Sequence, residues 1–185
     1  MTTERSVAEL SDPQRRQAVG GEVIHLMLRM RPPWVFIDEI RRFTESFCAC
    51  ACPGANREAG MALAVHELMQ NAITTSRGED IDLVFEVEPR ADRVSVSITN
   101  RCASEEFETL RDRIERMNRE PDALAHYLEV MRETPSKDRG GLGLARVRFE
   151  AQLSLSAAWV GGRVTVRAEG RIRVPALHAI GGTHV

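Results

Sequence analysis

The chain has 185 residues, of which 43% are hydrophobic and 28% charged, and these ordinary globular values exclude a fibrous repeat or a disordered chain. Lysine and arginine number 25 and aspartate and glutamate 27, which leaves a net charge of −2 and no global basic field to hold nucleic acid. We expect one compact domain, because a chain of this length buries about 70% of the surface that it exposes when unfolded.

The sequence carries no signal for a membrane or for export. No stretch approaches the ~20 apolar residues that span a bilayer, and the N-terminus lacks the apolar core of a signal peptide. These features predict a cytoplasmic protein without membrane contact.

The four cysteines are Cys48, Cys50, Cys52 and Cys102. They favour reduced, partly buried thiols, because C-x-C-x-C lacks a second ligand pair or a nearby histidine; a metal site and redox reactivity stay open as alternatives.

The predicted domain spans 20–175, between a polar mobile leader at 1–19 and a C-terminal tail at 176–185. Its first element is a strand over 22–30, which ends at Pro32 and Pro33 because proline cannot donate to a β-ladder. Apolar residues then recur at helical spacing from Trp34 to Phe43, which predicts a helix up to the cysteines. Asn56 is the expected N-cap of a second helix that ends before Ser76.

The second half of the chain alternates hairpins with helices. Runs of alternating hydrophobicity at 81–88 and 93–99 predict a β-hairpin, and 152–158 with 163–169 predict another. Between them, two amphipathic helices are expected over 104–133, the first capped by Ser104 and the second opened by Pro121, followed by a short helix after the glycines. This order predicts an α/β (α+β) fold: a two-layer α/β sandwich whose mixed, mostly antiparallel sheet carries helices on one face.

Two motifs are candidates for chemistry. Glu67 and Asn71 are four residues apart on the second predicted helix, so a carboxylate and an amide share one face. Alone, such a pair is usually a solvated polar edge. The run Gly140-Gly141-Leu142-Gly143-Leu144 precedes a helix, where glycines let backbone amides approach an anion. Alone this is also weak, and no lysine follows as a Walker loop requires.

The order of these motifs carries more weight than either one. A helix with H-E-L-M-Q-N-A, then a hairpin, then G-G-L-G-L before a helix, then two strands, resembles the GHKL superfamily with its Bergerat-type fold, which includes gyrase, heat-shock chaperones and histidine kinases. The resemblance covers 22–174 and is strongest to the small anti-sigma-factor serine kinases. These proteins bind ATP with Mg²⁺ and phosphorylate a partner.

The resemblance implies a role for each matching residue. Glu67 would be the general base, and Asn71 would be a ligand of the Mg²⁺ that bridges the phosphates; both residue types suit these roles. Lys137 and Arg139 would reach phosphate from a lid, although two solvated loop charges are an equal alternative. The residues so assigned to ATP and Mg²⁺ are Asn71, Asn100, Lys137, Arg139, Gly140, Gly141, Leu142, Gly143 and Leu144.

The sequence departs from this family where adenine would be recognised. Asn100 stands in place of the aspartate that accepts a hydrogen bond from the adenine amino group, and Cys102 and Ser104 replace the spaced glycines. A neutral acceptor forms a weaker bond than a charged one, so nucleotide binding is expected to be about 1 to 2 kcal/mol weaker, or absent.

A second departure is the helical insertion at about 104–133, which looks similar to the SiaB-like subgroup of these regulators. That subgroup pairs with small STAS-domain antagonists in partner-switching circuits. The stripe of Phe107, Leu110, Ile114 and Met117 is read as packing against the sandwich, with partner docking as the alternative. A homodimer is implied by the resemblance alone.

The sequence thus leaves two leading hypotheses. The first is a regulatory serine/threonine protein kinase that binds Mg-ATP and acts on a STAS-type anti-sigma-factor antagonist. The second is a catalytically silent, nucleotide-independent binding module with the same fold. An α/β domain unrelated to nucleotides is a third. His66 is not expected to be a phosphate acceptor, because acceptor histidines of histidine kinases lie on a separate helical domain that is not seen here.

Overall fold

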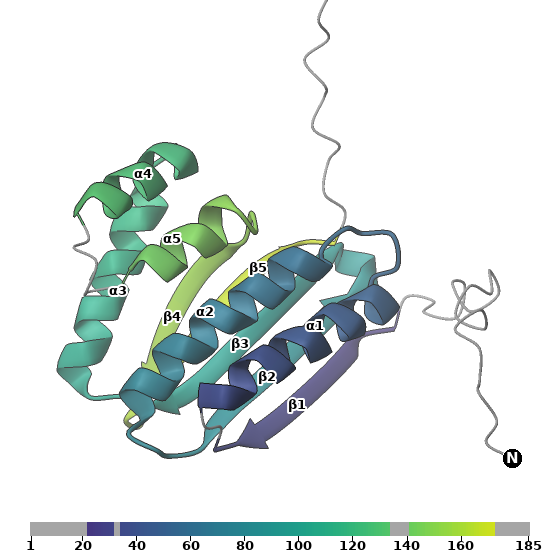
Figure 1. Ribbon diagram of the computed structural model, residues 1–185, viewed down its shortest axis with the longest axis horizontal. Helices are drawn as coiled ribbons and strands as arrows, with labels where there is room; N and C mark the ends of the chain where they lie inside the picture. The colour runs from purple at the N-terminus through teal and green to yellow at the C-terminus, as the bar shows by residue number, and fades with distance from the viewer. Residues whose placement is uncertain (1–21, 32–33, 134–140, 173–185) are drawn as a thin grey trace, which may run out of the picture.

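The computed structural model describes residues 22–31, 34–133 and 141–172. In this part of the chain a five-stranded sheet with the order β1-β2-β3-β5-β4 forms one layer, and helices cover one of its faces (Figure 1). The predicted two-layer α/β fold is confirmed, and each pairing in the sheet is antiparallel. The expected leader and tail lie outside the described residues. The strands are β1 (Ile24–Met30), β2 (Ile81–Glu88), β3 (Arg93–Arg101), β4 (Ser154–Val160) and β5 (Arg163–Arg171).

The hairpin of β2 and β3 forms the middle of the sheet and follows from its alternating sequence. Successive side chains of a strand point to opposite faces, so every second residue of β2 is buried under the helices. The buried residues of this face are Ile81, Leu83, Phe85, Val87, Val94, Val96 and Ile98. β3 continues to Arg101, beyond the predicted 99, and this places Asn100 on the strand itself.

Helices α1 (Ile37–Ala51) and α2 (Glu58–Ser76) lie side by side across this face (Figure 1). A short 3₁₀ turn over Trp34–Phe36 leads into α1. Trp34 and Phe43 are 56% and 41% exposed, so the buried stripe of α1 is narrower than its apolar spacing predicts. The predicted cap of α2 at Asn56 is wrong, because Asn56 adopts a left-handed φ of 53° and the helix begins two residues later.

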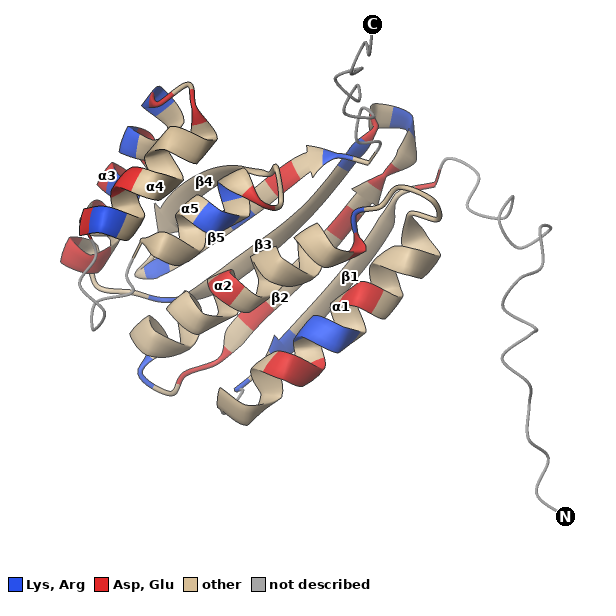
Figure 2. Ribbon diagram, turned by 45° about the horizontal axis from the view of Figure 1, so that its top comes forward, with Lys and Arg blue, Asp and Glu red and all other residues tan. Residues whose placement is uncertain are grey.

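The insertion forms α3 (Ser104–Arg119) and α4 (Ala123–Glu133), which lie near α5 (Leu142–Phe149) beyond β4 (Figure 1). Ser104 is the first helical residue rather than the cap. Asp122, not Pro121, opens α4, since its Oδ1 accepts hydrogen bonds from the amides of Leu124 and Ala125 at 2.9 and 3.0 Å. Charges of both signs are interspersed along α3 and α4 (Figure 2).

The insertion is fixed to the rest of the domain. Ile114 and Met117 are buried in the core, and Phe107 and Leu110 pack partly against it, which confirms the packing interpretation of this stripe. Arg148 of α5 donates to the carbonyls of Met117 and Glu120 at the end of α3. These carbonyls have no partner within their own helix, so the guanidinium acts as a cap and ties α3 to α5. None of the helices in the described ranges is long and apolar enough to cross a membrane.

Candidate functional site

A cavity of about 880 Å³ opens between α2, α3, α5 and the adjoining strands β3 and β5. Residues far apart in the sequence meet in its wall because α2 and α5 lie side by side on the same face of the sheet (Figure 1). The predicted site residues that line it are Glu67, Asn71, Asn100, Gly141, Leu142, Gly143 and Leu144. Lys137, Arg139 and Gly140 lie outside the described residues.

The Glu67 carboxylate is buried and held on both sides. Its Oε1 accepts a hydrogen bond from Nη1 of Arg146 at 2.7 Å, and the residue is only 8% exposed. Its Oε2 lies against the backbone of Gly143, where an added Cβ would come within 2.3 Å of that oxygen. The glycine of the G-L-G motif therefore makes room for the carboxylate, and α2 and α5 approach closely at this point.

Arg146 joins two carboxylates at the cavity wall. Besides Glu67, its Nε and Nη2 donate to the two oxygens of Glu150 at 3.0 and 3.3 Å. The pKa of Arg146 is raised, first by the hydrogen bond to Glu150 and also by the charge of Glu67. The sequence alone does not mark Arg146 as a site residue. Its spacing of four residues from Glu150 predicts the ion pair between these two residues. No feature of the neighbouring sequence predicts its contact with Glu67 on α2.

Asn71 lies one helical turn after Glu67, on the side of α2 that lines the cavity. Within the described part of the chain no hydrogen bond is made by its side-chain amide, while its backbone carbonyl accepts from the Thr75 hydroxyl at 3.1 Å. The amide oxygen is therefore free to take a ligand from the cavity. Such an oxygen is a hard donor of the kind that Mg²⁺ prefers.

Asn100 is fixed by two acceptors at its nitrogen end. Its Nδ2 donates to the Thr75 hydroxyl oxygen at 2.8 Å and to the Arg101 carbonyl at 2.6 Å. A carboxylate at this position would place an oxygen against that carbonyl, so an amide fits where aspartate would not. The side chain is 3% exposed, and its Oδ1 is left as the acceptor. An acceptor is what recognition of an amino group needs.

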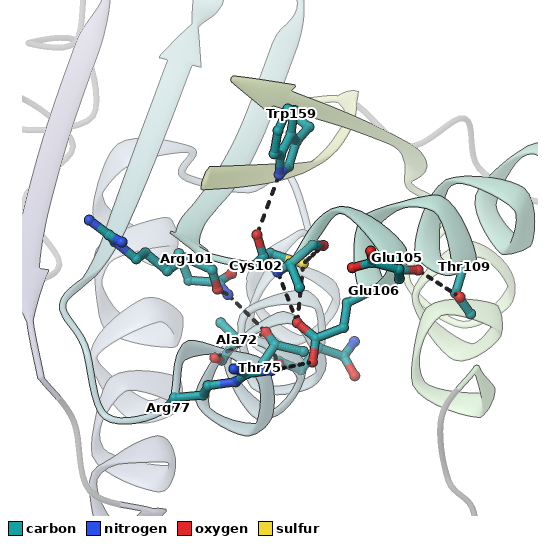
Figure 3. A network of polar contacts seen from close by, with 12 residues as sticks. Ala72, Thr75, Arg77, Arg101, Cys102, Glu105, Glu106, Thr109 and Trp159 are labelled. Atoms are coloured by element: carbon teal, nitrogen blue, oxygen red, sulfur yellow. Dashed lines mark hydrogen bonds and ion pairs between the residues drawn. The ribbon is translucent and has the colours of Figure 1, made fainter. Parts of the chain in front are cut away.

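Polar contacts also fix the junction between β3 and α3, where the resemblance predicted spaced glycines. Figure 3 shows Cys102 between the indole of Trp159 and the carboxylate of Glu106. The Trp159 Nε1 donates to the Cys102 carbonyl at 3.4 Å. Glu106 accepts from the Ala103 amide at 3.0 Å and pairs with Arg77 at 3.6 Å. The junction is thus tied to the end of α2 and to β4 rather than open.

His66 makes a contact within its own helix. Its Nε2 lies 2.9 Å from Nε2 of Gln70, one turn later. Among the described residues, no group of three His, Cys, Asp or Glu is arranged to hold a metal ion.

The cysteines of α1 are free and mostly buried, with Cys50 exposed. Burial raises the pKa of the Cys48 thiol to about 12 and that of the Cys52 thiol to about 11, from an ordinary value of 9.0. A thiol with a raised pKa is a poor nucleophile because the thiolate is the reactive form. Cys48 and Cys52 therefore contribute to packing in the core.

These thiols predict an alkaline loss of stability. The folded state keeps their protons above pH 9, whereas the unfolded chain loses them there, so stability is full below about pH 9 and falls as the pH rises toward 11. At pH 10 each thiol should remove about 1 kcal/mol from the free energy of unfolding. Urea unfolding at pH 8 and pH 10 measures this loss. Cys48→Ala should reduce it and the exposed control Cys50→Ala should not; equal losses in all three proteins would contradict the assignment.

No protein-family model matches the sequence. No curated protein matches it either. Among solved structures, a chain of the SiaB-SiaC complex from Pseudomonas aeruginosa has a TM-score of 0.62 to this structure, at 17% sequence identity. The likeness covers 89% of this chain and 100% of that chain. At this identity it establishes a common architecture, and we conclude that the sheet and helices around the cavity have the fold of a component of that complex.

Proposed function

We propose that the protein is a regulatory serine/threonine kinase of the anti-sigma type that binds Mg-ATP in the cavity and acts on a small STAS-type partner. The observation that carries the proposal is the convergence of Glu67, Asn71 and the Gly141–Leu144 segment, which opens α5, on one cavity. Its volume of about 880 Å³ lies within the range that small-molecule sites occupy. These residues are the ones that the GHKL resemblance assigns to the general base, the metal ligand and the phosphate-binding turn.

In the proposed reaction, the side-chain hydroxyl of the partner attacks the terminal phosphorus of ATP. The new oxygen–phosphorus bond forms as the bond to the ADP oxygen breaks, and Glu67 accepts the hydroxyl proton. Asn71 would hold Mg²⁺, which neutralises phosphate charge when it is bound. The backbone amides at Gly141 and Gly143 would face the phosphates, and Oδ1 of Asn100 would accept from the adenine amino group.

A protein partner is supported by the shared fold. The neighbouring crystal structure is a complex of two proteins, SiaB and SiaC, so this architecture occurs in a protein–protein assembly. We propose that the present chain likewise works by partner switching, with a partner of the SiaC type.

A silent binding module is the second candidate function, and one contact favours it. The pairing of Glu67 with Arg146 leaves the proposed base bound to a permanent cation. One oxygen of the carboxylate is thus already occupied by a donor, and the other lies against Gly143. In this alternative the pair is a structural link between α2 and α5, and the protein regulates its partner by contact alone.

Thermal unfolding with nucleotide tests the proposal. At about 100 times its dissociation constant, a ligand adds about 2.7 kcal/mol, which corresponds to a rise in melting temperature of about 5 to 10 °C for a domain of this size. We expect this rise with Mg-ATP, a loss of its Mg²⁺ dependence in Asn71→Ala and a smaller rise in Asn100→Ala.

The matched control is Asn118→Ala, which removes an asparagine outside the cavity that donates to the Leu155 carbonyl at 3.1 Å. This variant should melt at a lower temperature yet keep the full rise with Mg-ATP. If millimolar nucleotide leaves the melting temperature of the wild type unchanged, the kinase proposal fails. Binding of the partner without nucleotide would then establish the silent module.

A further inference from the structure

The pair of Glu67 and Arg146 poses a problem for a kinase site. The base must accept a proton from the incoming hydroxyl, but one of its oxygens already accepts from Arg146 and the other lies against Gly143. The Glu67 end of the pair is buried, and a buried carboxylate without a partner is costly, so the contact is not given up without a replacement. Catalysis therefore needs something that takes Arg146 away from Glu67.

The place of Arg146 at the cavity wall allows such an exchange through rotation of its side chain. Three of its nitrogens are used, Nη1 on Glu67 and Nε with Nη2 on Glu150. The guanidinium is a rigid plane, so Nη1 leaves Glu67 only when the whole group turns and its bonds to Glu150 shift with it. Its side chain is 36% exposed, whereas that of Glu67 is 10% exposed. The arginine is thus the mobile member of the pair and the carboxylate the fixed one.

The position of Arg146 indicates which group could replace Glu67 as its hydrogen-bond acceptor. It lies on α5 one turn after Gly143 and lines the same cavity as the Gly141–Leu144 segment. Of the described residues that line the cavity, Arg113 and Arg146 are the arginines, and Arg146 is the one bound to the base. A terminal phosphate carries more negative charge than a carboxylate and accepts the same forked hydrogen bonds.

We infer that Arg146 exchanges Glu67 for the terminal phosphate of ATP, so that ATP frees the base and ADP leaves it locked. This inference rests on the proposed function. Arg146 is then the residue that distinguishes the nucleoside triphosphate from the diphosphate. Once the phosphate has moved to the partner, the pair forms again and the site returns to its inactive state.

Calorimetric titration with ADP and with a non-hydrolysable ATP analogue, both with Mg²⁺, tests this assignment. We expect the wild type to bind the analogue about tenfold more tightly than ADP, and Arg146→Gln to bind both equally, with its affinity for ADP within about twofold of the wild type. Arg146→Lys keeps the charge but lacks the fork, so its preference should fall to about threefold. The control is Arg116→Gln, which removes an exposed pair with Glu133 between α3 and α4 and should keep the tenfold preference.

The outcomes separate the inference from the proposed function. If Arg146→Gln binds both nucleotides with the wild-type preference, the inference is overturned and the nucleotide site stands. If the wild type binds neither nucleotide, both fall. If Arg146→Gln does not fold, the result for Arg146→Lys decides, because an undiminished preference in that variant also overturns the inference.

Discussion

Replacing Glu67 with glutamine is expected to slow phosphate transfer to a partner hydroxyl by about 10²- to 10⁴-fold, with Mg-ATP binding kept within about twofold. Glutamine retains an amide oxygen for Nη1 of Arg146 but cannot accept the hydroxyl proton. Transfer is measured as labelled phosphate on a purified small STAS-domain protein. Calorimetry measures nucleotide binding by the same variant.

The matched control for this substitution is Glu105→Gln. Glu105 is an exposed carboxylate in the first turn of α3 and does not line the cavity. Its loss should change neither transfer nor binding. If Glu67→Gln transfers phosphate at the wild-type rate, Glu67 is not the general base, and the buried pair with Arg146 has only a structural role.

Much of the fold could be predicted because apolar residues recur at regular spacing along its strands and helices. Apolar residues recur at every second position of β2 and β3, and the sheet buries these positions under the helices, so the sequence predicts the hairpin to within two residues. The wrong predictions concern features that depend on backbone conformation or on tertiary packing. Asn56 has a residue type suited to capping, but it adopts a left-handed conformation before α2. Trp34 is apolar but stays exposed, since spacing does not reveal which residues the sheet can cover.

For the candidate site, the order of the motifs predicts which residues belong to it but not the contacts that they make. The sequence motifs that contain Asn71 and Gly141 predict residues of one site, and these residues do line one cavity although the two motifs belong to different helices. The state of the carboxylate could not be predicted, because Arg146 reaches Glu67 across the gap between α2 and α5. The role of Asn100 was equally hidden. Its amide suits the Arg101 carbonyl beside it, a contact that depends on the conformation at the end of β3.

The insertion contacts the core, the cavity and α5. α3 packs its apolar stripe into the core, yet Glu106 and Arg113 on the same helix line the cavity. Arg148 ties the end of α3 to α5, the helix that carries Gly143 and Arg146. The insertion therefore contacts both the cavity and the helix that carries Gly143 and Arg146.

Gly143→Ala is the second substitution with a large expected effect. Its Cβ would lie 2.3 Å from Oε2 of Glu67, so the carboxylate must move or the pair with Arg146 must break. A displacement of about 1 Å at a reacting group lowers the rate by about 10²-fold, and we expect phosphate transfer to fall by that factor. The fold should survive, because alanine favours a helix over glycine by about 1 kcal/mol and Gly143 has no left-handed φ.

The control is Gly60→Ala on α2, where an added Cβ would meet Ala151 at 3.4 Å, an ordinary contact. This variant should transfer phosphate at the wild-type rate. Melting temperature and transfer are measured for both proteins, since a loss of activity counts only where the fold is kept. If Gly143→Ala remains folded and fully active, the carboxylate moves without consequence, and its position against α5 is not part of catalysis. A folded variant with the expected loss would show that this close approach sets the position of the base.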